Sequence, residues 1–469
     1  SIPVQAEGIV VNENSRELTN GFYTWQITTD GDGKLGVAVN IRENGLANVF
    51  YTDGRGTFCL KGSQEEIIAR DSLRLEENTS YQIKLYQAGK VYKLYVDGAL
   101  VAEGESEYLV EQPGKSGLYQ PGGKDETVRV AVHEGYEIFC YFNDYSDPKN
   151  LGQWTNADTA QTEDGQLKLT ISAVNNAVAI DTPRIANGIY EFDVTHNPNS
   201  ALGRLGFLFR SEDNNNYQGV FYDVSKNWFW LKNSSYGAYQ ANSQIENGKP
   251  YHIRMEVEGP KVLLYINGEQ VGGGSYGMTE KKGYFGIRKQ FMNAEVLLDN
   301  LKIQETVKVD VLEKPDRPAV IQSRDMKVTM DQNFPRVLNY QSGQKTLPGN
   351  PKKTYNVSLN GITCTPVVTC TKKGENTLEY ELKTSNAKIR LQYKVNGTTL
   401  DMNILSIEEK EGYVIRDIQF DNQALVSTSP GDTSASFATV ETNGGWYEVR
   451  DHIFDSMDHV TEQDLGQAG

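Results

Sequence analysis

The chain has 469 residues and a formal net charge of −16, with 62 acidic and 46 basic side chains. We therefore expect no nucleic-acid partner and no anionic membrane partner, because both need a clustered basic surface. No apolar stretch reaches the roughly 18 residues of a membrane-spanning helix, so membrane insertion is not expected. The length accommodates about three domains of roughly 150 residues each, and 26 Tyr with 44 Gly suit an extracellular β protein.

The first part of the chain is repeated further along. Residues 21–30 (GFYTWQITTD) return as residues 188–197 (GIYEFDVTHN). Four more blocks follow in the same order: GKLG at Gly33 as GRLG at Gly203, VFY at Val49 as VFY at Val220, residues 81–98 as residues 251–268, and KSGLY at Lys115 as KKGYF at Lys281. A repeat of this length indicates a duplicated domain, since solenoid units repeat about every 20 to 50 residues.

Alternating apolar and polar residues predict antiparallel strands in both copies. In residues 251–258 (YHIRMEVE), the odd-numbered residues are apolar or aromatic and the even-numbered ones are polar. Asn-Gly and Asp-Gly pairs recur between such segments, for example at Asp97 and Asn267, and they supply the positive φ of tight hairpins. The sequence therefore predicts an all-β protein with tandem jelly-roll sandwiches and a third β-sandwich.

The repeat also suggests domain boundaries. We expect a first module at residues 1–134 and a second at residues 135–306. A linker with two prolines follows at residues 307–323, and a third sandwich occupies residues 324–469. The polar residues from Arg450 onwards lack clean periodicity, so we expect this third domain to be incomplete.

The hairpin motifs LYVDG and LYING, followed by VLLDNLKI, resemble those of laminin-G and concanavalin-like jelly rolls. This resemblance implies the fold and a role in carbohydrate binding. A sugar site needs an aromatic face beside planar hydrogen-bonding groups, and the second module has the richer supply. The candidate carbohydrate-binding residues are Arg210, Tyr222, Trp228, Trp230 and Arg288, with Tyr217 nearby.

Trp228 and Trp230 share one face of their predicted strand because side chains alternate. Two interpretations stay open: the pair forms a ligand platform, or it fills the core between the sheets. The first module has Phe58 and Cys59 in the corresponding place, so its surface is expected to be poorer.

Calcium is a further expectation from the jelly-roll resemblance. Such modules often tie their first and last strands with a Ca²⁺ ion held by carboxylates and backbone carbonyls. Asp299, together with Asp144 or Asp147, is the candidate group of ligands. The alternative is that these are solvated aspartates in turns, and no cofactor is expected to be required.

The third region contains FPRV at residues 334–337 and LVSTSPGDTSASFA at residues 425–438. These segments resemble the galactose-mutarotase-like β-sandwich that precedes the catalytic barrel in family 101 glycoside hydrolases. Those enzymes are endo-α-N-acetylgalactosaminidases, which release core O-glycans from mucin-type glycoproteins. In that family the acid and nucleophile lie in a (β/α)₈ barrel, and this chain shows no alternating βα pattern.

We therefore assign no catalytic residue. The sequence contains no G-x-S-x-G, no H-E-x-x-H and no phosphate-binding loop motif. The resulting hypothesis is that this chain is the non-catalytic, carbohydrate-binding and scaffolding part of a secreted bacterial mucin-degrading glycosidase. Its expected partners are GalNAc- and galactose-containing glycans. The alternatives are a surface adhesin or stalk of tandem sandwiches, and a chain that is itself a hydrolase.

Overall fold

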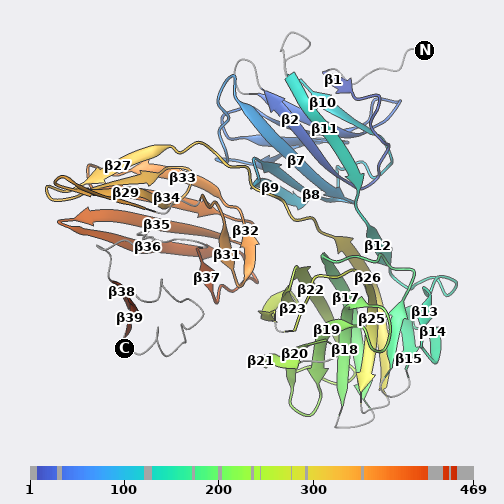
Figure 1. Cartoon of the computed structure of the whole chain (residues 1–469). Coiled ribbons are helices and arrows are strands. Elements are labelled where there is room, and N and C mark those ends of the chain that lie inside the picture. Colours follow the sequence, from blue (N-terminus) through green and yellow to red (C-terminus); the bar gives the residue numbers. More distant parts are fainter. Residues whose placement is uncertain are drawn as a thin grey trace.

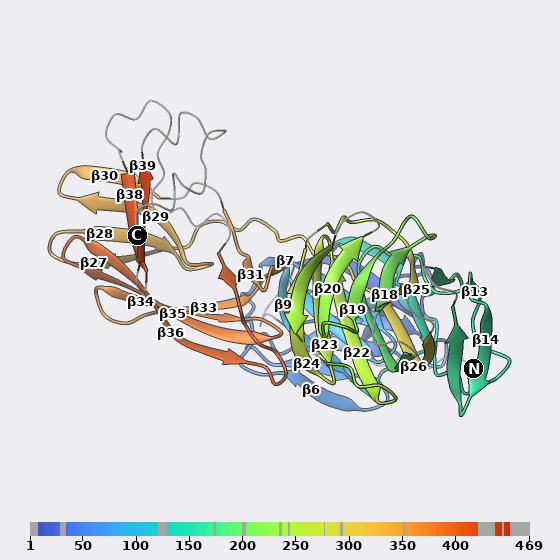
Figure 2. The same cartoon turned by 90° about the horizontal axis from the view of Figure 1, so that it is seen from below.

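The computed structural model describes residues 8–28, 34–120, 129–171, 175–198, 203–233, 237–242, 244–275, 277–290, 294–349, 353–420, 437–442 and 445–450. Every regular element in these ranges is a β-strand (Figures 1 and 2), which confirms the all-β prediction. Within them, no helix has the length and apolar character needed to cross a membrane. The segment LVSTSPGDTSASFA lies almost entirely outside the described residues.

The first module (β1–β11) consists of two antiparallel sheets. One has the order β1 (Ile9–Val11), β10 (Lys115–Tyr119), β3 (Leu35–Ile41), β4 (Asn48–Thr52), β5 (Phe58–Lys61), β6 (Glu65–Ala69). The other has the order β11 (Arg129–Glu137), β2 (Gly21–Thr28), β7 (Ser80–Ala88), β8 (Val91–Val96), β9 (Ala99–Glu105). Trp25, Phe50 and Leu85 are buried between the two sheets, as alternation requires.

The second module (β12–β26) repeats this plan with more strands. Its larger sheet has the order β14 (Thr159–Glu163), β15 (Gln166–Thr170), β26 (Ala294–Glu305), β17 (Gly188–Pro198), β22 (Pro250–Glu258), β23 (Lys261–Ile266), β24 (Glu269–Gly274), and β12 (Cys140–Asn143) pairs with β26. The facing sheet has the order β13 (Trp154–Thr155), β16 (Asn176–Ala179), β25 (Tyr284–Gln290), β18 (Arg204–Ser211), β19 (Gln218–Asp223), β20 (Trp228–Asn233), β21 (Gly237–Asn242). Phe192, Phe207 and Phe285 pack edge to face or tilted in the core between them.

The third region (β27–β39) contains shorter sheets. The first sheet has the order β27 (Pro318–Gln322), β28 (Lys327–Asp331), β29 (Arg336–Ser342), β30 (Lys345–Pro348), and the second has the order β32 (Ile362–Cys364), β31 (Val357–Leu359), β37 (Ile418–Gln419). The third sheet has the order β33 (Val367–Lys372), β34 (Thr377–Lys383), β35 (Ala387–Asn396), β36 (Thr399–Glu409). The strands β38 (Phe437–Thr442) and β39 (Gly445–Arg450) form a separate pair. Leu263 and Tyr265 of the second module belong to the buried cluster of this region, and Val367 joins that of the first module. The third region therefore packs against both modules.

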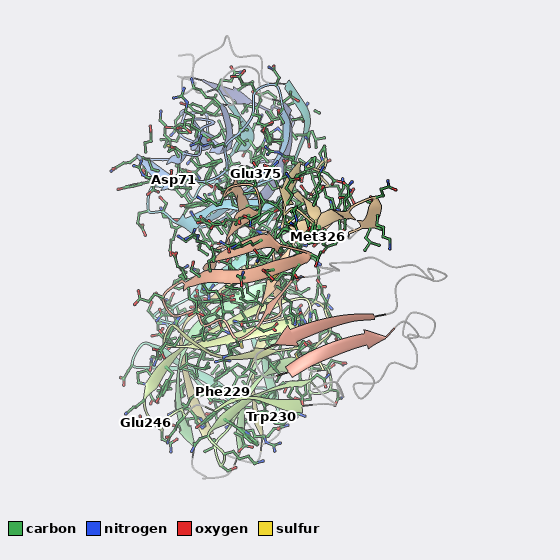
Figure 3. The ribbon with its side chains drawn as sticks, turned by 90° about the vertical axis from the view of Figure 1, so that its left-hand side faces the viewer. Asp71, Phe229, Trp230, Glu246, Met326 and Glu375 are labelled. Carbon is green, nitrogen blue, oxygen red and sulfur yellow. The ribbon has the colours of Figure 1, made fainter. Side chains whose placement is uncertain are left out.

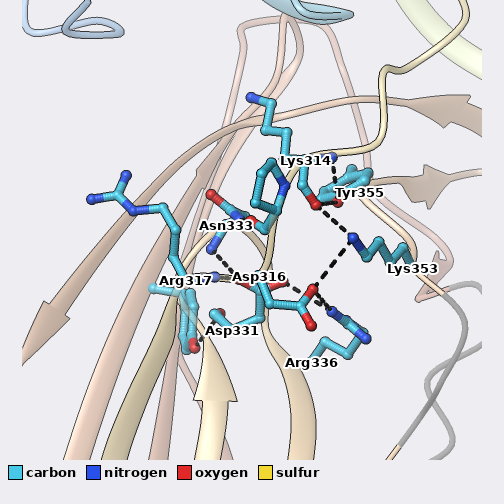
Figure 4. Close-up of polar contacts among 10 residues, drawn as sticks. Lys314, Asp316, Arg317, Asp331, Asn333, Arg336, Lys353 and Tyr355 are labelled. Atoms are coloured by element: carbon cyan, nitrogen blue, oxygen red, sulfur yellow. Dashed lines mark hydrogen bonds and ion pairs between the residues drawn. The ribbon is translucent and has the colours of Figure 1, made fainter. Parts of the chain in front are cut away.

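A polar cluster joins the connecting segment to the third region (Figure 4). Arg336, from the FPRV motif, donates to the buried carboxylate of Asp331 at 3.1 Å and to Asp316 at 2.6 Å. Asp331 Oδ1 also accepts from the backbone N–H of Arg317 at 3.1 Å. Strand β27, which follows directly, already pairs with β28, although it lies within residues 307–323 of the expected linker. The FPRV arginine is thus structural.

The strand registers show which residues of the two modules correspond. Gly36 pairs with Tyr51, and its counterpart Gly206 pairs with Phe221. Tyr51 therefore corresponds to Phe221, and the VFY-to-VFY match is out of register by one residue. Such a slip moves a side chain to the opposite face of a strand.

The KSGLY match is also out of register. Gly117 pairs with Ala38, and Gly286 pairs with the corresponding Leu208. Gly117 therefore corresponds to Gly286 and not to Gly283, which shifts the match by three residues. By the same pairing, Tyr119 corresponds to Arg288.

Candidate functional site

The two tryptophans lie on the outer face of the second module, the side of the β13–β21 sheet that is turned away from the main core. Along β20, Phe229 and Leu231 enter the main core. Trp230 instead packs against a separate small cluster of Leu208, Tyr217 and Phe221. Figure 3 labels Phe229 and Trp230 at their neighbouring positions on this strand. The prediction of a shared face for Trp228 and Trp230 agrees with this alternation, and both rings stay outside the main core.

The strands β25, β18, β19 and β20 lie side by side in this sheet (Figure 2), and one row of paired residues crosses all four. Arg288 of β25 pairs with Gly206 of β18, Gly206 with Phe221 of β19, and Phe221 with Trp230 of β20. A Cβ atom at Gly206 would lie 2.5 Å from the Phe221 ring, so the glycine allows this ring to lie flat across β18. The rings of Phe221 and Trp230 meet edge to face at 6.0 Å.

Each indole ring on this face has cationic neighbours. The Lys226 Nζ atom lies 4.4 Å from the centre of the Trp228 ring. Arg204 Cζ lies 4.8 Å and Lys232 Nζ 5.5 Å from the centre of the Trp230 ring. These separations fall within the range of cation–π attraction. The face therefore combines aromatic surface with hydrogen-bond donors.

Arg288 is placed in the same way beside Tyr217, with Cζ 4.5 Å from the ring centre. Its Nη1 donates to Asn176 Oδ1, while its Nε has no hydrogen-bond partner among the described residues. The same holds for Trp230 Nε1 and Gln290 Oε1. Buried polar atoms normally have partners, and these three atoms lie beneath the outer face without one among the described residues.

Arg210 does not face a ligand. It is 0 % exposed, and its five N–H donors are all used. They bond to the carbonyl oxygens of Ala186, Thr279 and Gly259 at 2.6–2.7 Å, and to the side-chain oxygens of Gln218 and Asn187 at 3.2–3.3 Å. Burial lowers the pKa of this guanidinium. The sequence-based assignment of Arg210 to a sugar site is therefore corrected, because the side chain joins loops within the module.

Tyr222 is buried in the main core. Its hydroxyl accepts from the backbone N–H of Ile245 at 3.1 Å and donates to Asn227 Oδ1 at 3.0 Å. Since it points to the opposite face from Phe221, it cannot contribute to a surface that includes Trp230. Of the predicted carbohydrate-binding residues, the structure brings together Trp228, Trp230 and Arg288.

The sequence-based assignment omitted Arg204, Phe221 and Lys232. Two of these were detectable: Lys232 follows Trp230 by two residues and so shares its face, and Arg204 stands in the repeated GRLG motif. Phe221 was missed because the VFY match was shifted by one residue.

The predicted calcium ligands are less well grouped than the residues of the outer face. Asp144 is exposed, and its Oδ1 accepts from the backbone N–H of Ser146 at 3.0 Å in a local turn. Burial raises the pKa of Asp299, with smaller contributions from Asp193 and Asp144. Among the described residues, no group of three His, Cys, Asp or Glu side chains is arranged to hold a metal ion.

A recess lies where the three parts of the chain meet, and it is lined by Lys93, Arg254, Glu256 and Tyr413 among others. Several of its charges are paired within the protein. Arg254 bonds to Glu256 at 2.8 Å and to Glu191, and Lys93 lies 3.7 Å from Glu103. This recess therefore has the character of an interface between modules, and the outer face is the better candidate site.

The comparison with family models identifies residues 321–468, less than half of the chain, as similar to the galactose mutarotase-like fold domain. Among solved structures, carbohydrate-binding module CBM66 from Bacillus subtilis is 20% identical and has a TM-score of 0.28; the match covers 33% of this chain and 96% of that one. A Bacillus subtilis protein of unknown function with a galectin-like fold is 14% identical, with a TM-score of 0.30, and the match covers 36% of this chain and 97% of that one.

The β-glucanase of Bacillus licheniformis is 10% identical and has a TM-score of 0.29. The match covers 36% of this chain and 99% of the glucanase. The similar structures thus include a carbohydrate-binding module and a glycosidase, and each of these matches covers about a third of the chain. The C-terminal part of the chain is similar to the galactose mutarotase-like fold family.

Proposed function

We propose that this chain is the non-catalytic, carbohydrate-binding and scaffolding part of a secreted bacterial endo-α-N-acetylgalactosaminidase that acts on mucin-type O-glycans. In this proposal the outer face of the second module binds GalNAc- or galactose-containing glycans. The third region supports a catalytic barrel in the parent protein.

The observation that carries the binding role is the difference between the two modules at equivalent positions. Trp230 pairs with Phe221, and Cys59 pairs with the corresponding Tyr51. Cys59 thus replaces Trp230 in the first module, and Tyr119 replaces Arg288. Tyr51 and Tyr119 pack against each other there, with ring centres 5.4 Å apart. The same fold therefore carries indole rings with donors in one copy and a self-packed aromatic pair in the other.

The chemistry of the face suits a saccharide. The C–H surface of a pyranose packs on an aromatic ring, and its hydroxyls need fixed donors and acceptors. Trp228 and Trp230 offer partly exposed indole rings, and Arg204, Lys226 and Lys232 lie beside these rings as hydrogen-bond donors.

Support for the parent enzyme comes from the third region. It has the galactose mutarotase-like similarity, it follows two jelly-roll modules, and it packs against both of them. That order resembles the layout of family 101 glycoside hydrolases upstream of their catalytic barrel.

A glycan array carrying mucin core structures, with and without charged substituents, tests the binding role. We expect the chain to bind GalNAc- or galactose-containing glycans with affinities between high micromolar and millimolar, which tethering of several sites on the array strengthens. Trp228→Ala should reduce binding, and Tyr119→Ala in the first module should leave it unchanged. If the wild-type chain binds no glycan, the binding role is rejected and the stalk or adhesin interpretation is favoured.

A further inference from the structure

The outer face of the second module is rich in positive charge, although the whole chain carries −16. Four cations lie on it beside aromatic rings: Arg204, Lys226, Lys232 and Arg288. Asp223 contributes a carboxylate to this group, bonding to Arg204 at 3.2 Å. The face therefore carries an excess of positive charge within an acidic protein.

Three of these cations have no carboxylate partner in the part of the chain that the structure describes. No ion pair within 4.0 Å involves Lys226, Lys232 or Arg288 there, whereas Arg204 has Asp223. Arg288 is only 6 % exposed, and its hydrogen bonds go to the neutral oxygens of Asn176 and Asn214. A buried guanidinium without a counter-ion is costly, so an incoming anion would be favoured at this place.

The cations also influence one another. Burial lowers the pKa of Lys232, and the nearby charges of Arg204 and Arg288 lower it further. All three groups are thus close enough to act on the same incoming charge. A negatively charged ligand would relieve this repulsion and strengthen each contact.

We propose that this face binds saccharides that carry a negative charge, a carboxylate or a sulfate, in preference to their neutral forms. This inference rests on the proposed function, since it assigns a ligand class to the same face. The charged group lies beside the ammonium of Lys232, close enough to Arg204 and to the buried Arg288 guanidinium to feel their charge, and the sugar ring packs on the exposed part of the Trp228 and Trp230 indoles. Ammonium and guanidinium groups make charge-assisted hydrogen bonds to the oxygens of carboxylates and sulfates.

The first module provides a matched control. Lys61 corresponds to Lys232, because Lys61 pairs with Val49 and Lys232 with the corresponding Gly219. Its surroundings differ, since Tyr119 and Cys59 replace Arg288 and Trp230. A lysine without the neighbouring guanidinium and indole should contribute nothing to anion binding.

Calorimetry on the full chain tests the inference with three matched ligands: a neutral galactose–N-acetylgalactosamine disaccharide, its sialylated form and its sulfated form. We expect at least one acidic form to bind about tenfold more tightly than the neutral one, as one charge-assisted contact predicts. Lys232→Gln should reduce this preference to about twofold, and Lys61→Gln should leave it intact. Raising the salt concentration should weaken acidic binding only.

The outcomes separate the two proposals. Equal binding of neutral and acidic ligands by the wild-type chain overturns the charge preference and leaves the carbohydrate-binding role standing. No binding of any ligand overturns both. A preference that survives Lys232→Gln overturns the placement of the charged group, provided that the variant keeps the wild-type melting temperature. The sialylated and sulfated arms distinguish a carboxylate from a sulfate.

Discussion

Arg210 in the second module occupies the position of Asn40 in the first, and both side chains tie together the same two backbone segments. Asn40 Nδ2 donates to the carbonyl of Thr19, before β2, and to that of Gln112, before β10. Arg210 donates to the carbonyls of Ala186, before β17, and Thr279, before β25. The duplicated fold thus keeps this connection while the residue type changes, because the longer arginine also reaches Gly259.

Arg210→Met is therefore expected to destabilise the second module by about 3 to 5 kcal/mol, since several buried carbonyl oxygens lose their donors at roughly 1 to 3 kcal/mol each. Urea unfolding followed by circular dichroism measures this loss. Arg210→Lys, which restores some donors, should recover part of it. A change below about 1 kcal/mol for Arg210→Met would contradict the structural role.

The third region should depend on the ion pair between Arg336 and Asp331. Because Asp331 is fully buried and Arg336 almost so, Arg336→Met leaves a carboxylate in the interior without this partner and should cost about 3 to 5 kcal/mol. Asp316→Asn is the matched control, since Asp316 is partly exposed and an exposed pair contributes about 1 kcal/mol or less. If the two variants lose similar amounts of unfolding free energy, the buried ion pair contributes no more to stability than the exposed one.

Stability should fall in mildly acidic solution because of His196. Burial, with a smaller effect of Lys289, lowers its pKa from 6.5 to about 4. The unfolded chain takes up a proton at His196 as the pH drops below about 6.5, and the folded chain does so only near 4. Between these values folding loses up to about 3 kcal/mol.

The free energy of unfolding of the wild-type chain, measured from pH 7.5 to pH 4.5, checks this expectation. His196→Leu has a similar volume and no titrating group, so its pH profile should be flatter in this window. Identical profiles for the two proteins would rule out His196 as the source.

Removing divalent cations should leave the second module unchanged. The carboxylate of Asp144 is engaged by Ser146, and no third carboxyl, His or Cys side chain completes a metal-binding group among the described residues. We expect the melting temperature to shift by less than about 1 °C when a chelator is added. A drop of several degrees that calcium reverses, and that Asp299→Asn abolishes, would instead establish the calcium site at Asp299 and Asp144.

Much of the fold could be predicted from the sequence because strand alternation and Asn-Gly or Asp-Gly turns are local signals. Asp97 and Asn267, which were both predicted as hairpin turn residues, are an example. Both have positive φ, and the side chain of each accepts a hydrogen bond from a backbone N–H of the neighbouring strand. The strand register was harder to predict. Both modules contain the sequence VFY, but the strand pairing shows that the two VFY segments are shifted by one residue relative to each other.

The candidate site was predictable only in part. The shared face of Trp228 and Trp230 follows from alternation alone. The role of Arg210 does not, because it depends on carbonyl groups from loops that are distant in sequence and converge only in the folded chain. The row from Arg288 to Trp230 likewise depends on strand order, which the sequence does not reveal.

A crystal structure of the chain soaked with the glycan that binds best on the array tests the central claim most directly. The claim predicts a sugar ring packed on Trp228 or Trp230, with a polar group of the glycan within hydrogen-bond distance of Lys232 or Arg288. A glycan bound instead in the recess beside Arg254 and Tyr413, or on the first module around Tyr51, would contradict it.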